Sequence, residues 1–234
     1  MTRHHPTRDD SERLNESTSL AVLVSGGLDS GILLAESRDR HDRVHPLYVR
    51  QGLYWEGAEL DHLAHFLEAL RGPTLAPLQV LHMPVADTYG PHWSVTGRDV
   101  PDAGSPDESV FLPGRNVLLL AKTILWCHLH GVGEVVLAPL ECNPFPDATP
   151  EFFAALQDVV NRAVGGRVRV RWPYLGLSKR EVMLRGRDLP LGLTFSCLRP
   201  AAGRHCGRCN KCAERRRAFT DAGLPDPTAY EHQQ

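Results

Sequence analysis

Short apolar runs alternate with longer amphipathic segments along the chain. The runs are rich in Val and Leu, as is typical of buried strands, and they cover residues 21–24, 45–49, 78–83, 134–138 and 168–172. Apolar residues recur at helical spacing between them, which predicts helices over residues 32–36, 58–70, 117–129, 150–163 and 178–187. This alternation predicts an α/β fold: a doubly wound, parallel, five-stranded sheet with helices on its faces.

Two stretches depart from the simple alternation. Residues 86–110 are rich in Gly, Pro, Asp and Ser, which predicts a long loop of the kind that often covers a functional site. Residues 168–172 alternate apolar side chains with arginines, which predicts a strand with one exposed face at a sheet edge. Ligands of such sheets bind beyond the carboxyl ends of the strands, so we expect the segments that follow the predicted strands to meet there.

Composition narrows the class of protein. A chain of 234 residues with 42% hydrophobic content suits one α/β domain with an appendage, and its net charge of −2 argues against a general nucleic-acid or membrane-surface binder. Residues 1–19 are polar and lack the apolar segment of a secretory signal, so we expect a disordered extension and a cytoplasmic protein. The α/β domain is expected over residues 20–190 and a small zinc-binding region over residues 191–234.

The most specific motif joins the first predicted strand to the helix after it. Residues 25–30 read Ser-Gly-Gly-Leu-Asp-Ser. Backbone N–H groups of a Gly turn at a helix N-terminus bind anions, and serine hydroxyls add donors. Asp29 would repel a phosphate, so we expect it to hold Mg²⁺ or to brace the loop. The motif lacks the Gly-Lys-Ser/Thr of a Walker loop, and its plainest alternative is a Gly turn without a ligand.

Four cysteines near the end of the chain have the spacing of metal ligands. Cys197, Cys206, Cys209 and Cys212 follow the pattern Cys-x8-Cys-x2-Cys-x2-Cys. Four thiolates suit tetrahedral Zn²⁺ and leave no open position for water, so the metal is expected to be structural. An iron–sulfur cluster and a redox disulfide are the alternatives.

Three other residues near these motifs are expected to have plain roles. His205 is expected on the solvated surface, because four cysteines already complete the metal site. Cys127 lies within an apolar helix and is expected in the core, and Cys142 is expected in the core or in a pocket wall.

The loop of residues 25–30 resembles that of the N-type ATP pyrophosphatases, whose fold is adenine nucleotide alpha hydrolase-like. Three further motifs narrow the resemblance: Phe-Leu-Pro-Gly-Arg-Asn at residues 111–116, Pro-Asp-Ala-Thr-Pro-Glu-Phe at 146–152 and Leu-Ser-Lys-Arg-Glu at 177–181. With the cysteine spacing, and in this order from about residue 20 to 219, they resemble the 7-cyano-7-deazaguanine synthase family.

The resemblance implies an ATP-dependent ligase that forms a nitrile and takes part in queuosine biosynthesis. ATP would adenylate the carboxylate of 7-carboxy-7-deazaguanine, ammonia would displace AMP to give an amide, and a second ATP would activate the amide for conversion to the nitrile. ATP, Mg²⁺ and Zn²⁺ are the expected cofactors. The resemblance also allows a homodimer.

The resemblance also implies the site residues, most of which lie in these motifs. The expected ATP-binding residues are Val24, Ser25, Gly26, Gly27, Leu28, Asp29, Ser30 and Gly31. Asp29, Arg115 and Lys179 are expected to be catalytic, and Gln51, Glu59, Asn116 and Asp147 are expected to bind substrate. Plainer roles stay open for several of them: a surface salt bridge for Arg115, a solvated lysine for Lys179, a helix cap for Asn116 and a turn acid for Asp147.

Two segments differ from the family pattern. Residues 50–56 and 140–145 lie where the acceptor should bind. An alternative function is therefore a paralogous adenylating ligase that acts on another carboxylate, or an enzyme that modifies tRNA or a deazapurine. A third hypothesis is a nucleic-acid-binding module that uses the zinc site and Arg215, Arg216 and Arg217, but the net charge argues against it and a solvated helix face is expected for these arginines.

Overall fold

The computed structural model describes residues 19–232 and confirms the predicted α/β fold. The extension expected over residues 1–19 therefore lies outside the described residues, apart from Ser19, which opens the first strand. The strands are β1 (Ser19–Leu23), β2 (Arg43–Arg50), β3 (Gln79–His82), β4 (Glu134–Val136) and β5 (Arg169–Arg171). All neighbouring strands are parallel, in the order β3-β2-β1-β4-β5, so β1 lies at the centre of the sheet.

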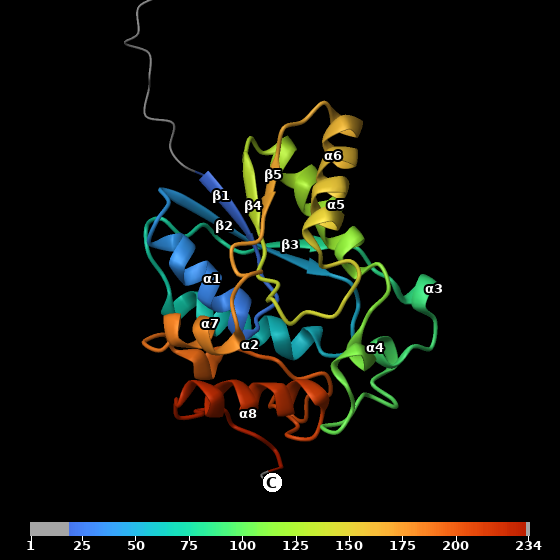
Figure 1. Ribbon diagram of the computed structural model, residues 1–234, viewed down its shortest axis with the longest axis vertical. Coiled ribbons are helices and arrows are strands. Elements are labelled where there is room, and N and C mark those ends of the chain that lie inside the picture. Colours follow the sequence, from blue (N-terminus) through green and yellow to red (C-terminus); the bar gives the residue numbers. More distant parts are fainter. Residues whose placement is uncertain (1–18, 233–234) are drawn as a thin grey trace, which may run out of the picture.

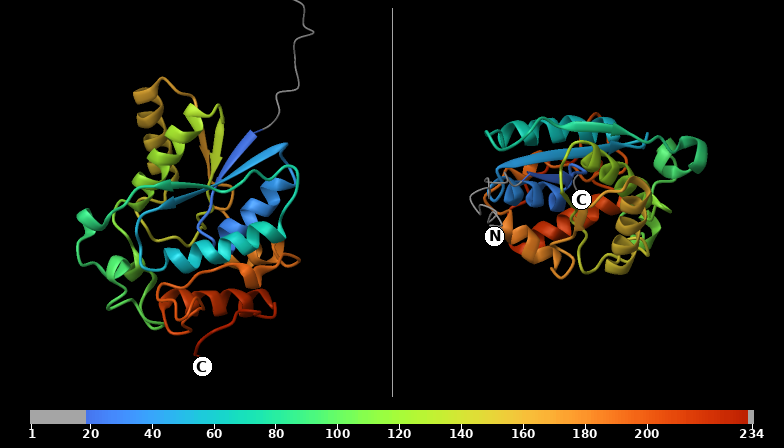
Figure 2. Two further views of the ribbon diagram at one scale, coloured as in Figure 1. Left: turned by 180° about the vertical axis from the view of Figure 1, so that it is seen from behind. Right: turned by 90° about the horizontal axis from the view of Figure 1, so that it is seen from above.

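Helices cover both faces of this sheet (Figures 1 and 2). The longer ones are α1 (Leu28–Arg38), α2 (Glu56–Ala69), α5 (Arg115–Leu129), α6 (Pro150–Val164), α7 (Lys179–Arg185) and α8 (Asn210–Ala222). Helices α1, α2, α7 and α8 share one apolar cluster with the sheet, whereas α5 and α6 pack against its other face. Among the described residues, no helix is long and apolar enough to cross a membrane.

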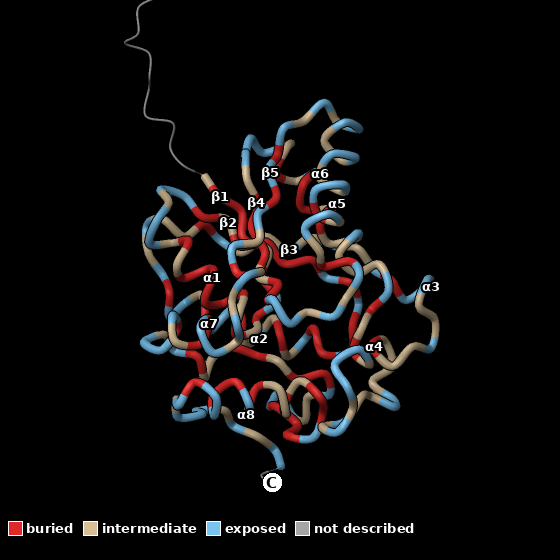
Figure 3. Tube along the Cα trace, in the orientation of Figure 1, coloured by how far each residue is buried: buried red, intermediate tan, exposed pale blue. Residues whose placement is uncertain are grey.

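The buried residues, red in Figure 3, gather along the central strands and the segments of the helices that cover them. Val22 and Ile32 lie in the cluster beneath α1, and Leu120 and Phe153 lie in the cluster beneath α5 and α6; all four side chains are fully enclosed. Cys127 belongs to the second cluster, so its predicted place in the core is confirmed. The two clusters thus hold the sheet from both faces, and the carboxyl ends of its central strands remain accessible to a ligand.

Strand β5 forms one edge of the sheet, as its alternating sequence predicts. Arg169 and Arg171 are exposed, while Val170 between them is buried. Both arginines form ion pairs with Glu134 of β4, at 3.3 and 3.1 Å.

The segment of residues 86–110 is more structured than the expected loop. It contains the short helices α3 (Ala86–Tyr89) and α4 (Trp93–Thr96) and the 3-10 helix η1 (Asp107–Val110). A third apolar cluster joins this segment to the cysteine region, with Val85, Val110, Leu198 and Cys209 among its buried members. Packing against the C-terminal region therefore orders a segment that has little apolar periodicity of its own.

The expectation that Arg215 lies on a solvated helix face is wrong. Arg215 is 1% exposed, and its guanidinium donates to the Thr228 hydroxyl (2.6 Å), the Thr194 hydroxyl (2.9 Å) and the carbonyl of Leu191 (2.8 Å). These uncharged acceptors satisfy a buried cation with hydrogen bonds. Arg215 thereby ties α8 to the segment around the 3-10 helix η2 (Leu191–Leu193).

Candidate functional site

A cavity of about 300 Å³ opens at the carboxyl ends of the central strands. Its walls come from the loop after β1, the segment after β4, the start of α5, residues 195–198 and the first turns of α7 and α8. Strands β1 and β4 are neighbours from which the chain continues in opposite directions along the sheet. This topological switch point is where open α/β sheets bind ligands.

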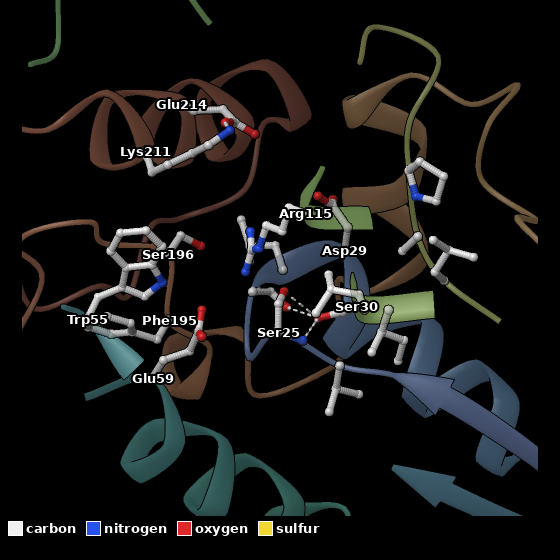
Figure 4. A pocket seen from close by; sticks show the side chains of 18 of the residues that line it. Ser25, Asp29, Ser30, Trp55, Glu59, Arg115, Phe195, Ser196, Lys211 and Glu214 are labelled. Atoms are coloured by element: carbon white, nitrogen blue, oxygen red, sulfur yellow. Dashed lines mark hydrogen bonds and ion pairs between the residues drawn. The ribbon is translucent and has the colours of Figure 1, made fainter. Parts of the chain in front are cut away.

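The loop of residues 25–30 forms one wall of the cavity (Figure 4). The backbone N–H of Ser25 donates to the Ser30 hydroxyl at 3.1 Å, and the two hydroxyls lie 3.2 Å apart. Gly27 is the N-cap of α1, so the first N–H groups of this helix face the same region. The loop therefore has the geometry of an anion site.

Six of the eight residues expected to bind ATP line the cavity: Val24, Ser25, Gly27, Leu28, Asp29 and Ser30. Gly26 and Gly31 allow close packing behind the loop. A Cβ at Gly26, whose φ is +74°, would lie 3.1 Å from Cγ of Glu59, and a Cβ at Gly31 would lie 3.2 Å from the Phe66 ring. The two glycines hold the loop against α2 because a side chain would push it away.

A chain of four charged side chains crosses the cavity wall from α1 to α8. The Lys179 ammonium lies 2.9 and 2.8 Å from the two carboxylate oxygens of Asp29 and 3.4 Å from Oε1 of Glu214. Oε2 of Glu214 is in turn 2.5 Å from the ammonium of Lys211. Burial would lower the pKa of Lys179, but the carboxylates of Asp29 and Glu214 outweigh it and raise that pKa, so the ammonium stays charged.

Arg115 opens α5 and lines the cavity. Its Nε donates to the side-chain oxygen of Gln51 at 3.2 Å. Gln51 is 1% exposed and does not line the cavity, and its amide nitrogen has no partner among the described residues. Gln51 thus orients the Arg115 side chain by a hydrogen bond from the side that faces away from the cavity.

Asn116 and Asp147 bind one another at the start of α5. The carboxylate of Asp147 accepts the Asn116 backbone N–H at 3.0 Å, and the Asn116 amide donates to the Asp147 carbonyl at 2.9 Å. Asn116 lines the cavity, whereas Asp147 is buried and lies outside its lining. The Asp147 carboxylate satisfies one of the free N–H groups at this helix N-terminus, where a negative charge is favourable.

Glu59 faces the cavity from α2, near Trp55 and Phe195 (Figure 4). Its carboxyl group is buried and accepts a hydrogen bond of 2.5 Å from the Tyr48 hydroxyl. Burial raises the pKa of Glu59 to about 8, against the opposing influence of Tyr48 and Arg115. A carboxyl group that holds its proton near neutral pH can both donate and accept hydrogen bonds.

Glu56, one turn earlier on α2, has a different environment. It is also buried, but its carboxylate accepts the backbone N–H groups of Gln51 (2.6 Å) and Gly52 (2.9 Å). Glu56 therefore fixes the chain after β2 rather than facing the cavity.

The four cysteines form a buried cluster beside the cavity. Their sulfur atoms all lie within 4.8 Å of one another, and the pairs Cys206–Cys212 and Cys197–Cys209 are each 3.9 Å apart. A zinc ion with bonds of about 2.3 Å requires tetrahedral edges of about 3.8 Å between its sulfur ligands. Backbone N–H groups of Leu198, Arg199, Cys206 and Arg208 donate to these sulfurs, as is usual around metal thiolates. The residues present fit tetrahedral zinc.

His205 and Cys142 are not where the sequence placed them. His205 is 2% exposed, and its Nε2 accepts the Ser196 backbone N–H at 3.1 Å. Burial and the nearby Arg215 lower the pKa of His205 to about 2, so its ring is neutral. Cys142 is exposed in the turn after β4 and does not line the cavity.

Two charged residues of the cavity wall, Lys211 and Glu214, are not among the residues that the sequence predicts to bind nucleotide or substrate. Lys211 stands between two of the cysteines and is readily interpreted as a partner of the metal site. The direction of α8, which turns both side chains toward the cavity, follows from tertiary packing: the helix contacts α7, and Arg215 ties it to the segment around η2.

Comparisons with known proteins agree with this architecture. The model of a family described as queuosine biosynthesis protein QueC matches residues 19–223. The 7-cyano-7-deazaguanine synthase of Stenotrophomonas maltophilia is 32% identical over 220 residues, which cover 89% of this chain and 97% of the relative. The enzymes of the same name from Xanthomonas oryzae and Xylella fastidiosa are 34% and 31% identical over the same length.

Among solved structures, a 4-thiouridine synthetase in complex with RNA and bound ATP has a TM-score of 0.50. The two chains are 14% identical, and the match covers 88% of this chain and 51% of the synthetase. This likeness concerns the fold. The match of the family model over most of the described chain, together with relatives of this identity and coverage, places the protein in the QueC family of queuosine biosynthesis proteins and makes it an enzyme.

Proposed function

We propose that this protein is an ATP-dependent ligase that converts 7-carboxy-7-deazaguanine and ammonia to 7-cyano-7-deazaguanine. Its relatives carry the name of that synthase. The observation that carries the proposal is the cavity itself, where an anion-binding loop, Arg115 and Lys179 meet at the switch point of the sheet. The reducing cytoplasm is the compartment that suits six free cysteines.

The proposed reaction has two activations. In the first, a carboxylate oxygen attacks the α-phosphorus of ATP, pyrophosphate leaves, and ammonia then displaces AMP from the acyl-adenylate to give the amide. In the second, the amide oxygen attacks the α-phosphorus of another ATP and pyrophosphate leaves. The amide nitrogen then gives up its two protons as AMP departs, which leaves the nitrile. Each activation converts a poor leaving group into AMP and places negative charge on departing pyrophosphate.

The chain offers groups for these charges. We assign the β and γ phosphates to the N–H groups of the loop and to Lys179, and the acyl-phosphate region to Arg115, because cations aimed at developing charge lower the barrier. Asp29 fits Mg²⁺ by its oxygen chemistry, and its present contact with Lys179 keeps the ammonium next to the loop. Mg²⁺, when bound, would neutralise charge on the phosphates. Cys197, Cys206, Cys209 and Cys212 would hold structural zinc.

We assign the acceptor to the end of the cavity formed by Trp55, Phe195 and Glu59. A deazaguanine presents N1–H and amino donors along one edge. The ionised form of a carboxyl group offers acceptors for both, and hydrogen bonds from these donors would favour that form of Glu59 over the protonated form of the free protein. Glu59 lines the cavity at this end, whereas the carboxylate of Asp147 is bound to the backbone of Asn116. Glu59 is therefore a better candidate for reading this edge than Asp147.

One observation favours a second candidate, a ligase for a different carboxylate. Trp55 and Asn143, which both line the cavity, belong to the two segments that differ from the family pattern. Incubation of zinc-loaded protein with ATP, Mg²⁺, ammonia and 7-carboxy-7-deazaguanine, followed by mass spectrometry, separates the two. Amide and nitrile are the expected products, and AMP release with some other carboxylate alone would favour the second candidate.

Replacement of Asp29 tests the assignment of the loop. Asp29→Asn removes the charge that holds Lys179 and is expected to reduce AMP formation by about 100-fold or more while the protein stays folded. Asp158→Asn, an exposed acid on α6, is the control and should act like the wild type. AMP formation at the wild-type rate by Asp29→Asn would contradict the assignment.

A further inference from the structure

A lysine within the metal-binding sequence faces the cavity at the ends of the strands. Lys211 lies on the first turn of α8, between Cys209 and Cys212. Its side chain lines the cavity together with that of Glu214, on the side where α8 approaches the loop of residues 25–30 (Figure 4). The segment expected to serve the metal thus also contributes a charge to this cavity.

The backbone on each side of Lys211 is held in place. Asn210 is 1% exposed, and its side-chain amide donates to the Ser105 carbonyl at 2.8 Å while its N–H donates to the Pro101 carbonyl at 3.0 Å. Cys212 is fully buried in the cysteine cluster. The backbone of Lys211 is therefore fixed, and its flexible side chain can turn from Glu214 toward a ligand.

Glu214 holds two ammonium groups side by side. Its Oε1 is 3.4 Å from the Lys179 ammonium, and its Oε2 is 2.5 Å from that of Lys211. Lys179 also contacts both carboxylate oxygens of Asp29, which belongs to the anion-binding loop. The two lysines come from different helices, so a single carboxylate brings them together at the edge of this loop.

We propose that Lys211 is a second cation for the β and γ phosphates of ATP and for the departing pyrophosphate, and that Glu214 is the positioning residue that keeps it beside Lys179. This inference rests on the proposed ATP-dependent reaction. Pyrophosphate has two linked phosphoryl groups, and two neighbouring ammonium groups match that charge distribution. Lysine acts on phosphate as a compact point charge, which needs no fixed bidentate geometry.

An ion pair on the helix surface is the ordinary explanation for Lys211 and Glu214, because they are three residues apart. Their side chains, however, are only 31% and 28% exposed, and Glu214 is shared with Lys179 from another helix. A surface pair would have no influence on phosphate binding, so ligand affinities distinguish the two explanations.

The test is calorimetric titration of the zinc-loaded protein with magnesium pyrophosphate, MgATP and AMP. We expect Lys211→Met to weaken pyrophosphate binding by about tenfold, which corresponds to about 1.4 kcal/mol. ATP binding should weaken in parallel and AMP binding should change less than about twofold. Lys211→Arg should restore most of the pyrophosphate affinity. Arg217→Met removes an exposed cation from the same helix and serves as the control.

The outcomes separate this inference from the proposed function. If Lys211→Met binds pyrophosphate as tightly as the wild type, the role of Lys211 is refuted and the proposed function is not affected. An equal loss of AMP and pyrophosphate affinity also refutes that role, because it would indicate a structural effect. These titrations need no acceptor, so a failure to form amide or nitrile refutes the proposed function without deciding this one. Lys211→Gln is measured in parallel, so that poor folding of one neutral variant does not decide the result.

Discussion

Glu59 makes the stability of this protein depend on pH in a direction that can be measured. Its carboxyl group is buried beside the Tyr48 hydroxyl, and burial raises its pKa from 4.5 to about 8. Between these two pH values the folded protein keeps a proton that the unfolded chain releases. Folding therefore takes up protons in this window, and the free energy of unfolding falls as the pH rises through it.

The magnitude follows from the size of the pKa shift. Each pH unit within the window changes the free energy of unfolding by about 1.4 kcal/mol, so the full shift of the Glu59 pKa corresponds to roughly 5 kcal/mol. Glu59→Gln keeps the shape and the hydrogen bond from Tyr48 but cannot ionise. We expect it to match the wild type near pH 4.5 and to exceed it by roughly 2–5 kcal/mol at pH 8.

Denaturant unfolding between pH 4.5 and 8.5 measures this difference. Glu56→Gln is the matched comparison on the same helix: it loses one of two backbone hydrogen bonds to its carboxylate and should lower stability by about 1–3 kcal/mol. Asp61→Asn, an exposed acid of α2, should leave the pH profile unchanged. A Glu59→Gln profile parallel to that of the wild type would refute the reasoning.

Two further predictions concern the metal cluster and the loop. Cys209→Ser should lose zinc, as measured by elemental mass spectrometry, and with it a large share of the roughly 10 kcal/mol that structural zinc contributes to folding. Cys142→Ser, at an exposed cysteine, should keep both the zinc and the stability. Retained zinc and an unchanged melting temperature in Cys209→Ser would contradict the metal site. Gly26→Ala should cost about 1–2 kcal/mol more in chemical denaturation than Gly52→Ala, because both have positive φ but only Gly26 is crowded by Glu59. Equal losses would show that crowding contributes nothing.

Local patterns in the sequence predicted much of the fold and part of the site. Alternating apolar runs predicted the parallel sheet, and Thr149 and Ser178 cap α6 and α7 through their own side chains. These signals are local, because hydrophobic periodicity and helix capping act over a few residues. Strands β4 and β5 are each shorter than the apolar run that predicted them, because the two strands pair only over Glu134–Val136 and Arg169–Arg171.

Charged residues were harder to place. Arg215 was expected in solvent and is buried. For Asp147 the sequence left open a substrate contact or a turn acid, and its carboxylate accepts a backbone N–H at the start of α5. A charged side chain has the same local sequence signature in both environments, and burial depends on partners far along the chain. For Asp147 that partner is 31 residues away, and for Arg215 the partner hydroxyl of Thr194 is 21 residues away.

The sequence by itself determined the anion-binding loop, the cysteine cluster and the parallel sheet, because each depends on spacing within a short segment. Only the tertiary structure decided which charges meet in the cavity. Asp29 and Lys179 are 150 residues apart, and Glu214 reaches Lys179 across a further 35. Packing of α7 and α8 against the sheet brings these groups together. That packing consists of apolar contacts and the buried hydrogen bonds of Arg215, none of which involves the four charged groups themselves.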